Sequence, residues 1–300
     1  MKMRKWLAAI AALIMTVCLL AGACAEGDPN ALLEENLKIT DAIREAFWDE
    51  RLIDTRKEYV EDAGITVMLD ECVGDAHHIR AAFRVSGRHF TEDDRPEFRH
   101  IRIEVPGLDN EEPASSGFIN WVENGRILWN DRAGDATFFF AAYTDQEGFS
   151  FDEKEITVTL ETLGIEGVQK PVANGKWAFS WDLRCSEKKQ EWTGLDLEIP
   201  DAGGAKLNDV AVGPMHLTAH LTVPGHPGVD APYVSGFVLK DGTRIEHAME
   251  SVSTGPVEGA EELVEEACFF NRVIDPDQVA ALLIGSHAWG YGASVFVELP

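Results

Sequence analysis

The stretch GKWAFSWDLRC occupies residues 175–185. Trp177, Phe179 and Trp181 stand at alternate positions within it. Alternate residues of a β-strand point to the same face of a sheet, so this spacing predicts a strand whose aromatic face is buried between two sheets. The stretch therefore favours a β-sandwich.

Short strand-like runs recur on both sides of this stretch. Their number and spacing predict an all-β chain of two tandem immunoglobulin-like antiparallel β-sandwiches, over residues 62–187 and 190–300. An Asn-Gly pair at 124–125 and an Asp-Gly pair at 241–242 predict hairpin turns, because both residue types tolerate a positive φ. The runs are HIRAAFRVSG, HIRIEVPG, ATFFFAAYT, EITVTLETL, LNDVAVGP, MHLTAHLTV and ASVFVEL.

An amphipathic helix is predicted over residues 31–52, ahead of the first sandwich. Leu33, Leu37, Ile43 and Phe47 follow one another at spacings of four, six and four residues. Such spacing gathers apolar side chains on one side of a helix.

A second, short helix is predicted near 275–284. Asp275 can cap a helix, Pro276 suits the first helical position, and Gly285 can end the last turn. This helix would interrupt the strands of the second sandwich.

The N-terminus has the layout of an export signal, with the cationic MKMRK followed by an uncharged apolar run over residues 6–25. Three interpretations remain open. Ala23 and Ala25 suit cleavage by a signal peptidase, Cys24 suits lipidation, and the run is long enough to stay as a membrane anchor. Each places the rest of the chain outside the cytoplasm.

The charge is strongly acidic: 52 Asp and Glu residues stand against 26 Lys and Arg. Without residues 1–25 the formal charge is −29, from 23 basic and 52 acidic residues. Nucleic acid and anionic lipid both attract basic surfaces, so the composition argues against either as a partner. We expect an unknown protein or cell-wall ligand as partner, and membrane contact only through the N-terminal segment if it is uncleaved or lipidated.

No residue pattern calls for catalysis, and we expect no enzyme, no catalytic residue, no cofactor and no metal. His216, His220 and His226 resemble a metal triad. In a strand, however, residues four apart are about 13 Å apart, too far to share one ion, so they are interpreted as solvated histidines.

Two tryptophans, Trp121 and Trp129, flank the predicted hairpin at 124–125 and are the candidates for an exposed binding surface. Cys72, Cys185 and Cys268 are too few for a disulfide framework. Free thiols are the first interpretation, and a Cys72–Cys185 bridge remains an alternative.

An ordered set of segments resembles the bacterial family called domain of unknown function 4179, followed by its immunoglobulin-like C-terminal module. Members are typically extracytoplasmic parts of Gram-positive cell-surface proteins, and some resemble sensory portions of membrane anti-sigma factors. The resemblance supplies no catalytic residues. Its segments are DAGITVMLDECVGDAHHIRAAFRV (62–85), GKWAFSWDLRC (175–185), LNDVAVGPMHLTAHLTV (207–223), VLKDGTRIE (238–246) and NRVIDPDQVAALLIG (271–285).

These observations favour a non-enzymatic extracytoplasmic protein that takes part in envelope interaction or ligand recognition. The alternative is a sensory ectodomain of an anti-sigma system, although MKMRK is too short to bind a sigma factor inside the cell. A carbohydrate-active enzyme is the third hypothesis.

Overall fold

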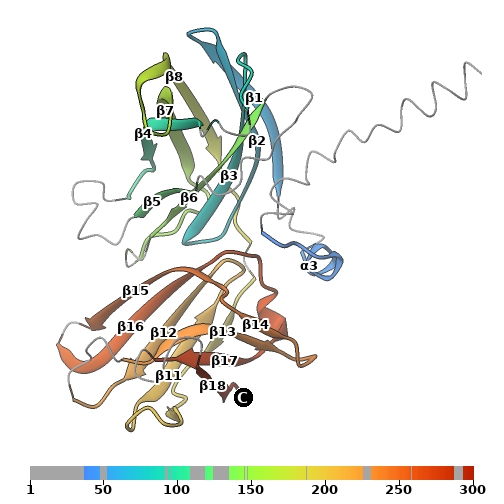
Figure 1. Ribbon diagram of the computed structural model, residues 1–300. Helices are drawn as coiled ribbons and strands as arrows, with labels where there is room; N and C mark the ends of the chain where they lie inside the picture. Colours follow the sequence, from blue (N-terminus) through green and yellow to red (C-terminus); the bar gives the residue numbers. More distant parts are fainter. Residues whose placement is uncertain are drawn as a thin grey trace, which may run out of the picture.

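The chain folds into two antiparallel β-sandwiches that lie one above the other (Figure 1). The predicted all-β class is thereby confirmed. No helix in the described part of the chain has the length and apolar character needed to cross a bilayer. The computed structural model describes residues 37–47, 53–91, 94, 96–108, 119–123, 135–144, 146, 148–186, 188–225, 231–257, 259–286 and 293–300, with only the backbone of 119–123 and of Glu261.

The first sandwich packs two sheets of strand order β1-β2-β3-β6-β5 and β4-β7-β8 against each other. All neighbouring strands within these sheets are antiparallel. Its strands are β1 (Asp54–Asp62), β2 (Ile65–Gly74), β3 (His78–Ser86), β4 (Pro96–Glu104), β5 (Ile119–Glu123), β6 (Ala136–Tyr143), β7 (Glu155–Ile165) and β8 (Val168–Asp182).

The core of the first sandwich contains the aromatic stripe of β8. Trp177, Phe179 and Trp181 are 0%, 3% and 3% exposed, as their alternation predicted. The indole N–H of Trp177 donates to the carbonyl of Ile65 at 3.1 Å and so ties the two sheets together. The core therefore satisfies the one polar group that Trp177 brings into it.

The second sandwich packs a sheet of order β10-β11-β12-β16-β15, with β9 also paired to β11, against a sheet of order β14-β13-β17-β18. A second apolar cluster fills the space between these sheets. Its strands are β9 (Gln190–Trp192), β10 (Leu197–Glu198), β11 (Lys206–Val212), β12 (His216–Thr222), β13 (Tyr233–Leu239), β14 (Arg244–Glu246), β15 (Met249–Val257), β16 (Ala260–Phe270), β17 (Val279–Gly285) and β18 (Ser294–Glu298).

The predicted hairpin at 241–242 is present between β13 and β14. Gly242 has a φ of 85°, which a glycine adopts without strain. Asp241 accepts a hydrogen bond from the backbone N–H of Thr243 at 2.8 Å, as turn aspartates do. The other predicted hairpin, at 124–125, lies outside the described residues.

The predicted helix near 275–284 is wrong. Pro276–Gln278 forms a single 3₁₀ turn capped by Asp275, and Val279 begins strand β17. β17 lies between β13 and β18, and most of its side chains are buried. A short apolar run is compatible with helix or strand, and here pairing on both sides selects the strand.

The predicted helix over 31–52 is also wrong as one element. Among the described residues of this range only α3 (Asp41–Ala46) is helical, and Thr40 caps it by accepting from the N–H of Ile43 at 3.3 Å. Lys38 has a φ of 54°, which no α-helix allows, so the helix cannot extend back through it. The first sandwich likewise begins earlier than residue 62, because β1 pairs with β2 from Asp54 onward.

Candidate functional site

The junction between the sandwiches is built around the carboxylate of Asp75, which lies in the turn between β2 and β3. Its side chain is 1% exposed. One oxygen accepts from the backbone N–H groups of His77 and His78 at 3.1 and 3.0 Å. The other accepts from the N–H of Met215 at 2.7 Å and bonds the imidazole of His216 at 2.8 Å, both in the second sandwich. Four hydrogen bonds thus converge on one buried carboxylate.

Charge and hydrogen bonding keep Asp75 ionised. Burial raises its pKa, but the charge and hydrogen bond of His216, together with His78 and the N–H of His77, outweigh burial and hold the pKa well below its usual range. For His78, burial and the nearby charge of Arg80 lower the pKa to about 3. A neutral His78 can donate from Nδ1 to the carbonyl of Met215, 3.2 Å away.

Two further contacts cross the junction. The buried guanidinium of Arg80 in β3 forms an ion pair with Glu250 of β15, whose side chain is 10% exposed. The ring of Tyr143 in β6 stacks on Phe269 of β16 with the ring centroids 4.5 Å apart. Charged, polar and aromatic contacts thus all join the two sandwiches.

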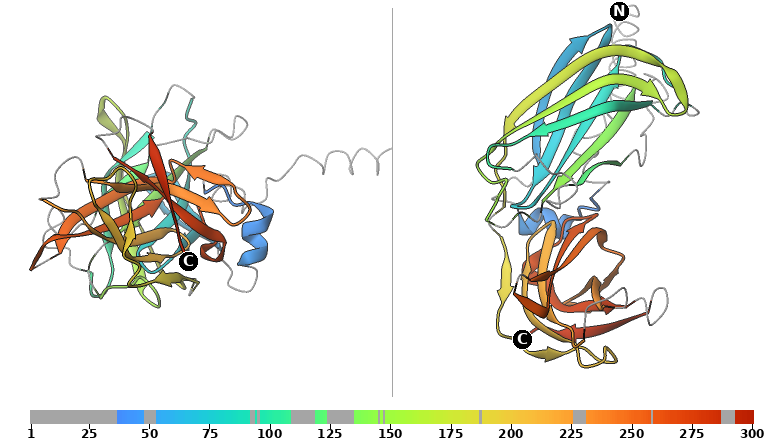
Figure 2. Two further views of the ribbon diagram at one scale, coloured as in Figure 1. Left: turned by 90° about the horizontal axis from the view of Figure 1, so that it is seen from below. Right: turned by 90° about the vertical axis from the view of Figure 1, so that its left-hand side faces the viewer.

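The N-terminal segment 37–47 covers the junction from one side (Figure 2). Leu37 and Phe47 are 0% and 2% exposed and belong to one apolar cluster with Val73 of the first sandwich and Met215 of the second. The carbonyl of Leu37 also accepts from the N–H of Val273 at 3.2 Å. Helix α3 is thereby held beside the second sandwich.

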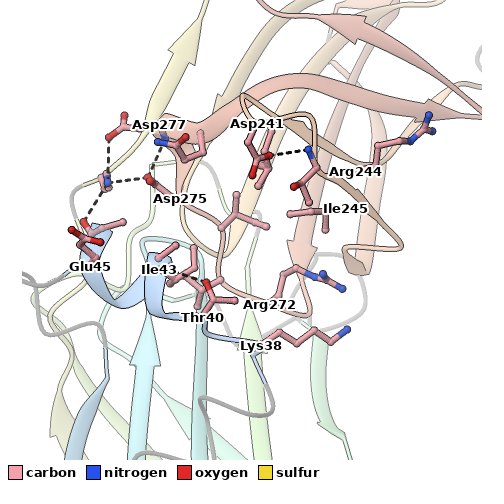
Figure 3. A pocket seen from close by; sticks show the side chains of 18 residues that line it. Lys38, Thr40, Ile43, Glu45, Asp241, Arg244, Ile245, Arg272, Asp275 and Asp277 are labelled. Atoms are coloured by element: carbon pink, nitrogen blue, oxygen red, sulfur yellow. Dashed lines mark hydrogen bonds and ion pairs between the residues drawn. The ribbon is translucent and has the colours of Figure 1, made fainter.

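A groove of about 800 Å³ lies between α3, the β13–β14 hairpin and the segment 272–278 (Figure 3). Side chains from all three regions form its walls, and more than a third of them are apolar. The apolar lining residues are Ala42, Ile43, Ala46, Leu239, Ile245, Val273 and Ile274.

Acidic side chains at one end of the groove are held by Lys188. Its ammonium lies 2.8 Å from Asp275, 3.2 Å from Asp277 and 3.3 Å from the carbonyl of Ala46. Burial lowers the pKa of Lys188, but its bonds to the two aspartates outweigh this and raise the pKa. The amide of Gln190 also donates to Asp277 and, with Lys188, lowers the pKa of that carboxyl.

Two other cationic side chains of the groove, Lys38 and Arg272, lie away from Lys188. In Figure 3 the side chains of Lys38 and Arg272 extend in the same direction, away from Asp275 and Asp277. Within the described chain, Lys38 and Arg272 have no carboxylate at ion-pair distance, and Arg272 bonds only the amide oxygen of Asn271, at 3.1 Å. Partial burial lowers the pKa of Arg272, although a guanidinium remains charged at neutral pH.

The site residues predicted from the sequence fall elsewhere. Ala23, Cys24, Ala25 and Trp129 lie outside the described residues. Trp121 is in β5, where only the backbone is described, so neither tryptophan can be assigned to a surface.

The interpretation of the strand histidines needs correction. The side chain of His216 is 14% exposed and bonded to Asp75, so it is not solvated. His220 is 35% exposed and lies 3.4 Å from Glu265, which fits the prediction better. His226 lies outside the described residues. Among the described side chains, no group of three or more His, Cys, Asp or Glu could hold a metal ion.

The three cysteines of the sandwiches are free thiols in the structure. Cys72 and Cys268 are buried and Cys185 is partly buried. Burial raises the pKa of Cys72 to about 12 and also raises that of Cys185 and of Cys268. These thiols are therefore poor nucleophiles at neutral pH.

Nothing in the local sequence pointed to the groove. Lys38 and Arg272 are separated by most of the chain, and the β13–β14 hairpin that completes the groove is ordinary in composition. The available signal was the position of Lys38 and Arg272 beside apolar residues in a chain dominated by acids.

Comparison with known proteins shows one distant similarity. No family model matches the sequence, and no curated protein matches it. Among solved structures, the chain is similar to one described as the crystal structure of the conserved domain protein from Bacillus anthracis, with 12% identity, a TM-score of 0.49, and 79% of each chain covered. A likeness this distant carries no information on function.

Proposed function

We propose that this chain is a non-enzymatic extracytoplasmic protein that recognises a ligand of the cell envelope through the groove beside α3. The observation that carries the proposal is the groove itself. Its volume of about 800 Å³, apolar walls and charged ends match the properties of binding sites, which are commonly ~300–1,000 Å³ with a few polar groups that orient the ligand.

The support around the groove favours a preformed site. In the groove wall, the N–H of Val273 donates a hydrogen bond to the carbonyl of Leu37, which precedes α3. The ammonium of Lys188 bonds both the carbonyl of Ala46 at the end of α3 and the carboxylate of Asp275. Walls held by such contacts need little reordering when a ligand binds, which leaves more of the contact energy for affinity.

The polar groups of the groove favour binding over catalysis. A general acid or base must reach the substrate and exchange a proton near neutral pH. Asp275 and Asp277 are instead paired with Lys188, and the pKa of Asp277 is lowered by its bonds to Gln190 and Lys188. The His216–Asp75 pair does not line the groove, and its carboxylate is buried in the junction.

The location outside the cytoplasm rests on the sequence. The cationic start and the apolar run over residues 6–25 support export, and the charge of −29 that remains suits an exposed compartment. The resemblance to Gram-positive surface proteins supports the same assignment. Antiparallel sandwiches commonly carry binding sites on loops, which suits ligand recognition.

A binding experiment with two matched variants tests the proposal. Protein spanning residues 26–300 is fluorescently labelled and incubated with isolated envelopes of the bacterium that encodes it. Ala42 is exposed on α3 and lines the groove, whereas Arg44 is exposed on the same helix outside it. We expect Ala42→Trp to lower envelope binding at least about tenfold and Arg44→Trp to retain it.

The controls decide between the outcomes. Thermal unfolding of both variants checks that each still folds. Binding that survives Ala42→Trp, or a wild-type protein that binds no envelope component, contradicts the proposal. Hydrolysis of an envelope polymer by the purified protein would contradict its non-enzymatic part.

A further inference from the structure

We propose that the ligand is a peptide in extended conformation, and that Lys38 and Arg272 hold one of its acidic side chains. This inference rests on the proposed function and goes beyond it by naming the ligand class and the residues that select it. The juxtaposition that carries it is an apolar groove with two cations at one end that have no acidic partner in the described chain.

The unpaired cations are the first argument. The chain has twice as many acidic as basic residues. With so many carboxylates available, most cations are expected to have an acidic neighbour, and Lys38 and Arg272 are exceptions within the described chain. Arg272 is partly buried, which removes water from its guanidinium without supplying a counter-charge. A ligand carboxylate would supply that charge, and the planar guanidinium can bind both carboxylate oxygens at once.

The distribution of polar groups favours a peptide over a lipid. Thr40, Thr243 and Gln278 lie among the apolar wall residues. The side-chain amide of Gln278 is exposed and has no hydrogen-bond partner in the described chain. A peptide backbone can pair with the amide of Gln278, whereas an acyl chain would bury that amide without a partner, at a cost in free energy.

The acidic side of the groove argues against an anionic membrane surface. Glu45 and Asp277 line the groove together with Lys38 and Arg272. A bilayer of anionic lipid would approach all of these groups at once and would be repelled by the two acids. An extended peptide can instead present one acidic side chain to the cations and apolar or basic side chains to the rest.

The first test uses a phage-displayed library of random heptapeptides without free carboxyl ends, panned against residues 26–300. We expect the peptides that bind to be enriched in Asp or Glu next to apolar residues. The double variant Lys38→Glu/Arg272→Glu should reverse this preference to Lys or Arg. Enrichment without acidic residues overturns the inference, as does binding to vesicles of anionic phospholipid that an enriched peptide does not compete with.

The second test measures the affinity of the most enriched peptide. We expect Arg272→Glu and Lys38→Glu each to weaken binding about tenfold or more, because a charge-assisted bond is replaced by repulsion. Lys57→Glu is the matched control, since Lys57 is an exposed lysine of β1 with the same φ of 54° as Lys38 and lies outside the groove. Equal loss in Lys57→Glu would mean that net charge alone is responsible, and would overturn the inference.

Failure of this inference can be told apart from failure of the proposed function. If Ala42→Trp abolishes envelope binding while Lys38→Glu and Arg272→Glu leave it unchanged, the groove binds a ligand of another class. If Ala42→Trp also leaves envelope binding unchanged, the groove is not the recognition site.

Discussion

Asp75 and His216 lie in different sandwiches, 141 positions apart in sequence, and are joined by a 2.8 Å hydrogen bond inside the junction. The same carboxylate oxygen accepts from the N–H of Met215. Because Asp75 is 1% exposed, water cannot replace these bonds when one is lost. The pair therefore connects the stability of the whole chain to the contact between its halves.

Replacing Asp75 by Asn should lower the free energy of unfolding by about 3 kcal/mol, since an amide cannot accept all four bonds of the buried carboxylate. Urea unfolding at pH 7 measures the change. Glu265→Gln is the control, because Glu265 faces His220 in an exposed pair and should cost at most about 0.5 kcal/mol. Equal effects of the two substitutions would contradict this prediction.

His78 should make the fold sensitive to acid. Burial lowers its pKa to about 3 in the fold, whereas an unfolded histidine titrates near its ordinary value of 6.5. Between these values the unfolded chain binds one more proton, so stability is complete above pH 6.5 and falls as the pH drops towards 3, by up to about 1.4 kcal/mol per pH unit.

The variant His78→Phe tests this contribution. It preserves an aromatic ring beside Tyr143 and Phe269 but cannot take up a proton. At pH 7 it should be less stable by about 1 kcal/mol, because the bond to Met215 is lost. Urea midpoints at pH 7, 6, 5 and 4 should then fall less steeply than in wild type, and parallel pH profiles would show that His78 is not the cause.

Glu266 should act in the opposite direction. Its carboxyl is 0% exposed, and burial raises its pKa to about 8 in spite of hydrogen bonds from the N–H of Val234 and the thiol of Cys268. The folded chain thus retains a proton that the unfolded chain releases near pH 4.5. Stability is complete below about pH 4.5 and is lost as the pH rises through 8.

Glu266→Gln should remove this alkaline loss, since the amide is neutral at every pH. Urea unfolding at pH 6, 7, 8 and 9 gives the profile, and Glu265→Gln on the same strand serves as an exposed control. The prediction is wrong if wild type and Glu266→Gln lose stability equally between pH 6 and 9.

Trp177→Phe should lower the free energy of unfolding by about 2 kcal/mol. The smaller ring leaves a cavity in the first core and leaves the carbonyl of Ile65 without its donor. Trp192→Phe is the matched control, because Trp192 is only partly buried and donates to the terminal Pro300 at 3.3 Å. Thermal unfolding compares the two variants, and a Trp192→Phe effect as large as that of Trp177→Phe would argue against the burial explanation.

The parts of the fold that could be predicted depend on neighbours in sequence. Trp177, Phe179 and Trp181 alternate because a strand places every second side chain on one face, and that pattern survives in the core. The Asp-Gly turn at 241–242 is similarly local. The helix expected near 275–284 was wrong because a short apolar run does not distinguish helix from strand until β13 and β18 pair with it.

Local periodicity was thus enough to predict the all-β class and the aromatic stripe of β8, and composition alone gave the acidic charge. The packing of distant segments decided the buried Asp75–His216 bond, the strand at 279–285, and the groove that places Lys38 near Arg272. The physical reason is that periodicity reflects the geometry of one strand, whereas these contacts join segments far apart in the chain. Their hydrogen bonds and charges become favourable only after both sandwiches have folded and excluded water between them.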